Sequence, residues 1–201
     1  MKQVKADVIL EAASKIFIKH GYNKTFMEDI AQEAKIGKGT IYHYFHSKED
    51  IFVAILRREH EDVISKTKEK IEQAETFGEK FKIFLVEPFT HIIPKHNFVM
   101  QIMKEDSPVF LVKLNEFKTE MNESFKRNLT SIFKFGLEGG VIKPKYENDI
   151  PELVELVFRL MFDGKEDKKG VLTEDKIDEL KANYLYFADI LLDAITLQER
   201  E

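Results

Sequence analysis

The stretch that decides the fold is TFMEDIAQEAKIGKGTIYHYFHSKED, which covers residues 25–50. Thr25 and Glu28 have the spacing of a capping box, which predicts the start of a short helix. The buried face of that helix is expected to hold four apolar residues: Met27, Ile30, Ala31 and Ala34. Lys35-Ile36-Gly37 is long enough only for a tight turn, and another helix is expected over residues 38–45. A helix, a three-residue turn and a second helix form the helix-turn-helix plan.

Helices are also expected on both sides of this stretch. Before it, six apolar residues recur with helical spacing: Val8, Ile9, Ala12, Ala13, Ile16 and Phe17. After it, Ser47 and Asp50 have the spacing of another cap, which predicts a fourth helix with Ile51, Phe52, Ile55 and Leu56 on its inner face. We therefore expect a three-helix domain over residues 1–47 and a helical domain over residues 48–201.

The outward side chains of residues 38–48 carry the chemistry of a nucleic-acid contact. With Ile41 and Phe45 directed into the core, the remaining side chains are mainly hydrogen-bond donors, and none is an acid. Hydroxyl and ammonium groups bind phosphates, and Gly39 would let the backbone approach a groove closely. Tyr42 is expected to contact DNA, whereas Tyr44 is equally suited to filling the core.

The charge is distributed unevenly along the chain. Residues 1–58 carry ten Lys or Arg and seven Asp or Glu, a net charge of +3. Because the net charge of the whole chain is −5, residues 59–201 carry a net charge of −8. This asymmetry indicates that only the N-terminal part meets a polyanion. Ordinary solvated helix faces are the alternative explanation of the same numbers.

The residues of the helix-turn-helix resemble the signature of the tetracycline-repressor (TetR) family of transcriptional regulators. The resemblance spans about residues 5–56 and is most specific over residues 38–48. It implies an all-α fold with an N-terminal three-helix DNA-binding domain, followed by a helical ligand-binding and dimerisation domain. It also implies base contacts and phosphate contacts to DNA, the former by Lys38 and Gly39, and the latter by Thr25, Thr40, Tyr42, His43 and Lys48.

Two residues depart from the family pattern. Lys35 stands where the family usually has the glycine of the turn, so a lysine is expected to adopt a left-handed backbone conformation. Gly37 replaces the usual Ser or Thr cap of the recognition helix, and glycine is an acceptable N-cap.

Large apolar side chains crowd the middle of the chain, which has 17 Phe and no Trp. These side chains either fill a core or line an apolar ligand cavity between helices interrupted by prolines. The resemblance implies a small-molecule pocket, for which the candidate lining residues are Phe84, Phe89, Phe98, Met103, Phe110, Leu114, Phe117 and Met121. Carboxylates such as Glu87, Glu105 or Glu120 would favour a cationic molecule over a fatty acyl chain, and the sequence leaves this choice open.

Two C-terminal helices are apolar on nearly all sides. Residues 153–162 and 184–197 contain few polar positions, so these helices need cover from more than their own core. A symmetric four-helix interface between two copies of the chain satisfies this need, and the resemblance implies the same. The candidate interface residues are Leu153, Val157, Leu160, Met161, Tyr184, Phe187, Leu191 and Ile195.

The sequence offers little to an enzyme. It has no cysteine and no phosphate-binding glycine loop or nucleophile motif, so we expect no enzymatic activity, no cofactor and no metal. His91 and His96 lack the spacing of two ligands on one helix face. No apolar stretch is long enough to cross a bilayer, and Asp7 and Glu11 interrupt any signal peptide, so we expect no membrane partner and a cytoplasmic location.

Two functions are compatible with these observations. The first is a dimeric repressor that binds an inverted-repeat operator in double-stranded DNA and is released by a small apolar or amphipathic effector. The alternative is a DNA-binding structural protein without an effector. An internal cavity would favour the first function, and a fully packed body would favour the second.

Overall fold

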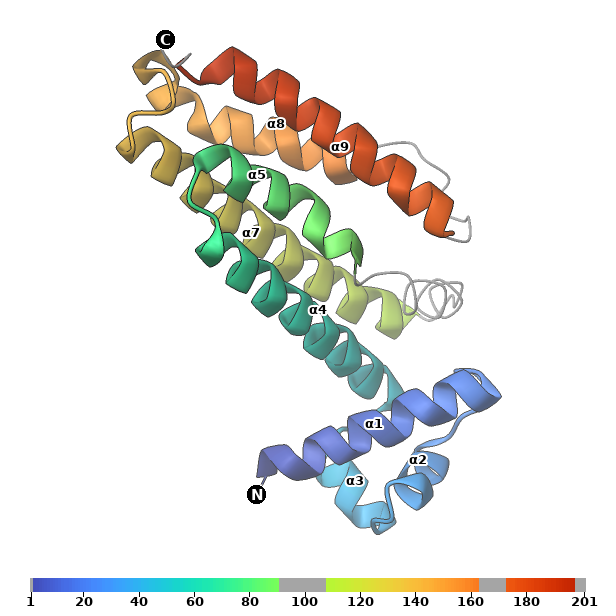
Figure 1. Ribbon diagram of the computed structural model, residues 1–201. Helices are drawn as coiled ribbons and strands as arrows, with labels where there is room; N and C mark the ends of the chain where they lie inside the picture. Colours follow the sequence, from blue (N-terminus) through green and yellow to red (C-terminus); the bar gives the residue numbers. More distant parts are fainter. Residues whose placement is uncertain (1, 91–107, 163–172, 198–201) are drawn as a thin grey trace. The chain divides into compact units, whose positions relative to one another are not determined.

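The computed structural model describes residues 2–90, 108–162 and 173–197, and these residues confirm the predicted all-helical fold class (Figure 1). Ile142 and Thr196 form an isolated antiparallel bridge. The helices in chain order are α1 (Lys2–His20), α2 (Met27–Glu33), α3 (Lys38–Tyr44), α4 (Lys48–Gln73), α5 (Phe77–Val86), the 3-10 helix η1 (Glu87–Thr90), α7 (Pro108–Glu138), the 3-10 helix η2 (Pro144–Asp149), α8 (Ile150–Phe162) and α9 (Glu174–Ile195).

The chain divides into two compact units, and two long helices contribute to both. The first unit contains α1 to α3, α4 as far as Asp62, and α7 as far as Thr119. The second unit contains the remainder of α4 and α7 together with α5, η1, η2, α8 and α9. The predicted domain boundary at residue 47 falls at the start of α4, whereas the first compact unit also includes the N-terminal part of that helix.

Aromatic rings form the centre of the first unit. Phe52 of α4 is fully buried, and its ring centroid lies 6.3 Å from that of Phe17, 5.7 Å from that of Tyr22 and 5.5 Å from that of Phe110. The predicted inner faces of α1, α2 and α3 surround these rings, since Ile9, Ile30 and Ile41 are each 0% exposed. Offset and edge-to-face ring contacts stabilise such clusters beyond the burial of apolar area.

The second unit is built around α5, α7, α8 and α9. Phe77 and Phe81 of α5 pack their rings against Phe133 of α7, with centroid distances of 5.9 Å and 5.6 Å. A Cβ atom at Gly136 would lie 2.7 Å from a ring carbon of Phe77, so only glycine permits this close approach of α7 to α5. Val157 of α8 and Ala188 of α9 complete the fully buried core.

The start of α2 differs from the prediction. The N-cap residue is Phe26, whose backbone N–H donates to the Asp29 carboxylate at 2.8 Å. The Thr25 hydroxyl instead donates to the Gly21 carbonyl at 2.8 Å, at the end of the preceding turn. The predicted capping box of Thr25 and Glu28 is therefore wrong by one residue, because the hydroxyl of Thr25 is used by the chain before it. The predicted cap at Ser47 is confirmed, since its hydroxyl accepts from the Asp50 N–H.

The turn between α2 and α3 has the predicted backbone strain. Lys35 has φ +55°, which makes it a non-glycine residue in the left-handed region. The N–H of Lys35 donates to the Gln32 carbonyl, and that of Ile36 donates to the Ala31 carbonyl. Gly37 is the N-cap of α3, as expected, and provides no side-chain cap.

Substitution of Lys35 by glycine should stabilise the protein. A left-handed conformation costs an L-residue roughly 1–2 kcal/mol, while the greater freedom of glycine in the unfolded chain opposes the gain by roughly 0.4–1 kcal/mol. We expect Lys35→Gly to raise the free energy of unfolding by about 0.5–1 kcal/mol in urea titrations. Lys35→Ala is the control, because it removes the same side chain and keeps the strain. Equal stabilities for the two variants would contradict the strain.

Candidate nucleic-acid interface

The exposed side of α3 carries most of the predicted contact residues. Ile41 is fully buried, whereas Lys38, Gly39, Tyr42 and His43 are exposed, with Gly39 and His43 on the side of the helix opposite Ile41. Tyr42 keeps 39% of its surface exposed although it is a large aromatic residue. A Cβ atom placed on Gly39 would meet nothing within 4 Å, so the backbone at this residue is open to a close approach. Thr40 is half-buried beside this surface.

Lys38 forms an ion pair with a glutamate of another helix. Its Nζ lies 2.5 Å from Oε1 of Glu28 in α2, and both side chains are largely exposed. The hydrogen bond from Lys38 is the main cause that lowers the pKa of Glu28, and the same hydrogen bond raises the pKa of Lys38. Residues 34–48 contain no acid, so the sequence analysis of this stretch did not identify Glu28, which lies in the preceding helix, as part of this surface.

Two of the residues predicted to contact phosphates, Thr25 and Lys48, have structural roles. Thr25 is 1% exposed, and its hydroxyl and backbone N–H are bonded to the Gly21 and Tyr22 carbonyls. Because burial removes it from the surface, the predicted phosphate contact of Thr25 is corrected to a role in the turn before α2. The Nζ of Lys48 donates to the Tyr22 carbonyl at 3.0 Å and lies 4.3 Å from the centroid of the Tyr22 ring.

Lys48 therefore ties the start of α4 to the turn before α2. A second, longer bond of 3.5 Å runs from its Nζ to the Thr25 carbonyl. An ammonium group has three N–H donors, so one donor is still available to a phosphate oxygen. A phosphate contact by Lys48 remains a proposal, and it would be made by a side chain already oriented by the fold.

Phe26 is an exposed aromatic residue that the sequence reading did not select. Its side chain is 66% exposed at the N-cap of α2, two residues before Glu28. A phenyl ring cannot cap the helix, and hydration of the ring is unfavourable, so this residue breaks a local rule. Such departures concentrate at functional surfaces.

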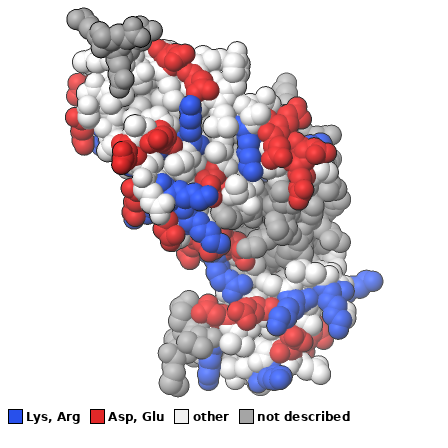
Figure 2. All heavy atoms as spheres, viewed as in Figure 1, with Lys and Arg blue, Asp and Glu red and all other residues white. Residues whose placement is uncertain are grey.

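Charge alone does not define a DNA-binding face. On the face drawn in Figure 2, basic and acidic side chains are interspersed and form no single basic patch. On this face, the mild positive charge of residues 1–58 is therefore not gathered into one patch.

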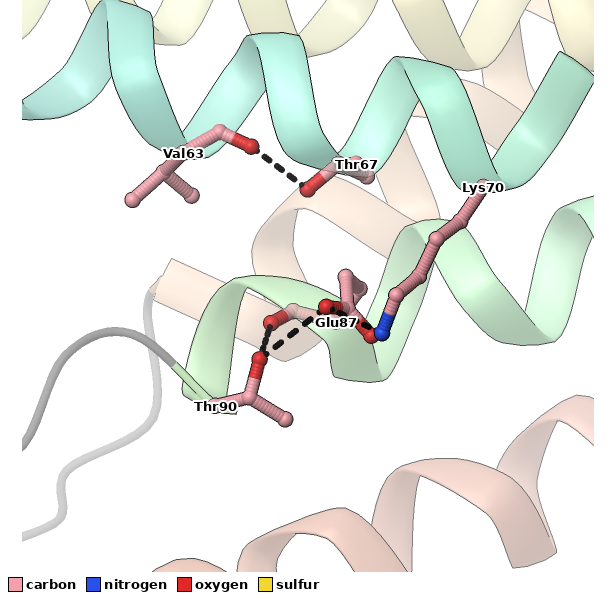
Figure 3. Close-up of polar contacts among 5 residues, drawn as sticks. All are labelled: Val63, Thr67, Lys70, Glu87 and Thr90. Carbon is pink, nitrogen blue, oxygen red and sulfur yellow. Dashed lines mark hydrogen bonds and ion pairs between the residues drawn. The ribbon is translucent and has the colours of Figure 1, made fainter.

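The second unit contains a buried carboxylate. Glu87 is 7% exposed, and its Oε1 lies 2.7 Å from the Lys70 ammonium and accepts a hydrogen bond from the Thr90 hydroxyl at 3.1 Å (Figure 3). The hydroxyl of Thr67, also buried, donates to the Val63 carbonyl one turn earlier in α4. Because Lys70 already neutralises Glu87, this carboxylate is not an open site for a cationic ligand.

A groove of about 350 Å³ lies among α4, α5 and α7 of the second unit. Its surface is mainly apolar, but charged, amide and hydroxyl side chains also line it, and the lining residues are Ile64, Thr67, Lys68, Ile71, Glu72, Lys80, Phe84, Asn128, Ser131, Ile132 and Phe135. The ammonium of Lys80 is bonded to the Ile71 and Ala74 carbonyls. Phe84 is the predicted ligand-lining residue that this groove contains.

Most of the other predicted ligand-lining residues lie elsewhere. Phe110 and Leu114 are buried in the core of the first unit, and the Phe117 ring there packs edge-on against His60 at 6.0 Å. All three side chains pack in the core of the first unit, away from the groove of the second unit, and their contact with a ligand stays a prediction. The Phe89 ring stacks on Tyr184 at 5.3 Å, and Met121 is half-buried.

The remaining candidates, Phe98 and Met103, lie outside the described residues. The same holds for His91, His96 and Glu105. In the described ranges, no helix combines the length and the apolar character needed to cross a bilayer.

The exposed apolar stripe of α8 and α9 has a different register from the prediction. Val157, Leu191 and Ile195 are at most 8% exposed and pack in the core of the second unit, so they are corrected to core residues. Leu153, Met161, Tyr184 and Phe187 are partly buried against that core. The side chains that face solvent are Leu156, Leu160, Leu185, Tyr186, Ile190 and Leu197, and Leu160 alone among them was predicted.

Comparison with known proteins agrees with this geometry. Residues 9–55 match the model of the bacterial regulatory proteins of the tetR family. The chain is 29% identical over 187 residues to the uncharacterized HTH-type transcriptional regulator YhgD of Bacillus subtilis, covering 88% of this chain and 96% of the relative.

Two solved structures share the fold at low sequence identity. A tetR-family transcriptional regulator from Mesorhizobium loti aligns with a TM-score of 0.71 at 19% identity, covering 98% of this chain and 99% of that one. The transcriptional regulator FadR of Bacillus subtilis, in complex with stearoyl-CoA, aligns with a TM-score of 0.57 at 21% identity, covering 92% and 95% of the two chains.

Two substitutions test the two kinds of role separately: one tests the structural role of Lys48, and the other tests the DNA contact of Tyr42. Lys48→Ala should lower the free energy of unfolding by roughly 1.5–3 kcal/mol, because charge-assisted bonds to the Tyr22 and Thr25 carbonyls are lost. Tyr42→Phe should leave the unfolding curve unchanged and weaken binding to duplex DNA in fluorescence anisotropy. Wild-type stability of Lys48→Ala, or unaltered DNA affinity of Tyr42→Phe, would refute the corresponding role.

Proposed function

The chain belongs to the tetR family of bacterial regulatory proteins, and we propose that it is a dimeric repressor that binds an inverted-repeat operator and is released by an apolar or amphipathic small molecule. The family consists of transcriptional regulators and not of enzymes. The donor-rich exposed side of α3 is the observation that carries DNA binding, since Lys38, Thr40, Tyr42 and His43 leave that side equipped for phosphates and base edges. Binding to the genome places the proposed action in the cytoplasm.

The exposed stripe of α8 and α9 supports dimerisation. Leu156 and Leu160 lie one turn apart on α8, and Tyr186 and Ile190 lie one turn apart on α9, all at least 44% exposed. Neighbouring large apolar side chains on a surface mark an interaction site. A second copy of the chain is the proposed occupant, because one helix-turn-helix reads one half-site and a palindromic operator needs two.

The groove among α4, α5 and α7 is the proposed effector site. Its volume of about 350 Å³ lies within the range of ligand pockets, at the lower end. Ile71, Phe84 and Ile132 would contact an apolar chain, while the Asn128 amide offers a donor and an acceptor. Stearoyl-CoA bound to the related fold of FadR makes an acyl-CoA the proposed class of effector.

The charges near the groove also favour an acyl effector over a cationic drug. Glu87 is paired with Lys70, and the Lys80 ammonium, which is bonded to two neutral main-chain carbonyls, keeps its positive charge at the groove. A cationic ligand would have to displace Lys70 to reach the buried carboxylate, and separation of a buried ion pair is costly.

Release from the operator is proposed to act through α4. This helix runs unbroken from Lys48 to Gln73, carries Phe52 in the core of the first unit and lines the groove with Ile71. An effector that prefers a different position of α4 would change the spacing of two recognition helices that must fit half-sites roughly 34–36 Å apart. By linkage, operator DNA would weaken effector binding by the same factor.

The alternative function is a structural DNA-binding protein without an effector. It is favoured by one observation: Phe110, Leu114 and Phe117 are buried in the core of the first unit and are not among the residues that line the groove of the second unit. The effector experiment below separates the two functions.

Disruption of the proposed dimer should also abolish operator binding. Ile190→Glu places a charge on the exposed stripe without disturbing the core, since Ile190 is 53% exposed. We expect this variant to be a folded monomer by analytical ultracentrifugation at micromolar concentration, whereas the wild type is a dimer. Ile18→Glu is the matched control at a 70% exposed position of α1 and should stay dimeric. A monomeric wild type would contradict the proposal.

Filling of the groove should block the response to an effector. At about 100 times its dissociation constant, stearoyl-CoA should stabilise the wild type by about 2.7 kcal/mol and release it from DNA. Ser131→Trp, in the groove, should abolish both effects and retain DNA binding, while the exposed control Ser65→Trp should respond normally. No effect of stearoyl-CoA on the wild type would overturn the acyl-CoA class. A normal response of Ser131→Trp would overturn the location.

A further inference from the structure

The ion pair between Glu28 and Lys38 stands on the surface that is to meet DNA. Lys38 is the first residue of α3, and the Tyr42 side chain lies one turn further along the same helix. Glu28 lies in the first turn of α2 and brings a negative charge to within 2.5 Å of the Lys38 ammonium. A carboxylate at this position repels the phosphate backbone of DNA, so its presence requires an explanation.

The pair is ionised at neutral pH in the free protein. The hydrogen bond from Lys38 holds the pKa of Glu28 below its ordinary value, and the bond to Glu28 holds the pKa of Lys38 above its ordinary value. Both shifts favour the charged forms. Lys38 therefore meets DNA with its charge already neutralised by a neighbouring carboxylate.

A phosphate and a base edge respond differently to this arrangement. A phosphate oxygen that approaches the ammonium also approaches Glu28, and two anions sharing one cation repel each other. The O6 and N7 atoms of guanine are neutral acceptors. They bind the free N–H donors of the ammonium while Glu28 keeps its own bond, because a lysine has three donors.

We propose that Glu28 is a positioning residue that reserves Lys38 for a base edge and keeps it from nonspecific phosphate contacts. This inference rests on the proposed DNA binding by α3 and adds a source of sequence specificity. In the nonspecific complex Lys38 stays paired with Glu28 and releases no DNA counterion. In the operator complex the same ammonium bridges Glu28 and a guanine.

The distinction is measurable through the salt dependence of binding. Each phosphate neutralised by a lysine steepens the plot of log affinity against log salt by about 0.9. Glu28→Gln removes the competing charge and frees Lys38 for a phosphate. For a 30-base-pair duplex of random sequence, we expect this slope to steepen by about 0.9 and the affinity at low salt to rise roughly fivefold.

The operator arm of the experiment uses the duplex that the wild type enriches from a random pool. Affinity of Glu28→Gln for this duplex should change by less than about twofold, because the guanine contact already exists in the wild type. The ratio of operator affinity to random-duplex affinity should therefore fall. Glu28→Asp keeps the charge and should restore the ratio toward the wild-type value.

Two controls identify the route of the effect. Glu33→Gln removes the same charge from an exposed residue at the other end of α2, so it should shift both affinities equally and leave the ratio unchanged. In a Lys38→Ala background, Glu28→Gln should no longer steepen the random-duplex slope. An unchanged ratio for Glu28→Gln, or the same steepening without Lys38, would overturn the inference.

Failure of the inference is distinguishable from failure of the proposed function. A wild type that enriches no duplex from the pool would contradict operator binding itself. A wild type that prefers the selected duplex while Glu28→Gln keeps the same preference would contradict only the role of Glu28.

Discussion

Burial of Ile41 sets the orientation of the recognition helix. The helix α3 has seven residues and buries Ile41 completely, while the flanking α2 buries Ile30. A helix this short gains little stability from its own hydrogen bonds, so its rotation is determined by what it packs against. Once Ile41 points inward, helical geometry directs Gly39 and His43 to the opposite side, and Lys38 and Tyr42 are exposed beside them. The chemistry offered to DNA thus depends on a single aliphatic contact.

Hydrogen bonds and ion pairs between the elements of the first unit hold the recognition helix in this orientation. Lys48 bonds the start of α4 to the carbonyls of Tyr22 and Thr25, and an ion pair joins Lys113 of α7 to Asp50. Glu28 adds a tie from α2 to the tip of α3. Functional surfaces need such supporting contacts, because a side chain that is free to move loses precision in binding. Polar residues that look like DNA ligands in the sequence thereby also serve the fold.

In the second unit, the division of apolar side chains between core and surface decides what can bind. The helix α8 buries Val157 and exposes Leu156 and Leu160, although all three are aliphatic. Glu87 is buried and paired with Lys70, so its negative charge in the second unit is neutralised. The remaining surface offers an apolar groove and an apolar stripe. A small molecule and a second copy of the chain are their proposed occupants.

The sequence by itself determined the all-helical fold class, the helix-turn-helix and the outward donors of α3, because these follow from local hydrophobic spacing and short turns, while the left-handed Lys35 was implied by the resemblance to a family that has glycine at this place. Only the tertiary structure decided which apolar stripe of α8 and α9 meets the core, since helices that are apolar on nearly all sides have no unique face. It also decided that Phe110, Leu114 and Phe117 belong to the first unit, and that Thr25 is buried and Lys38 paired with Glu28. Apart from the local turn of Thr25, each of these depends on a residue distant in sequence or on another helix, and hydrophobic periodicity carries no information about such a partner.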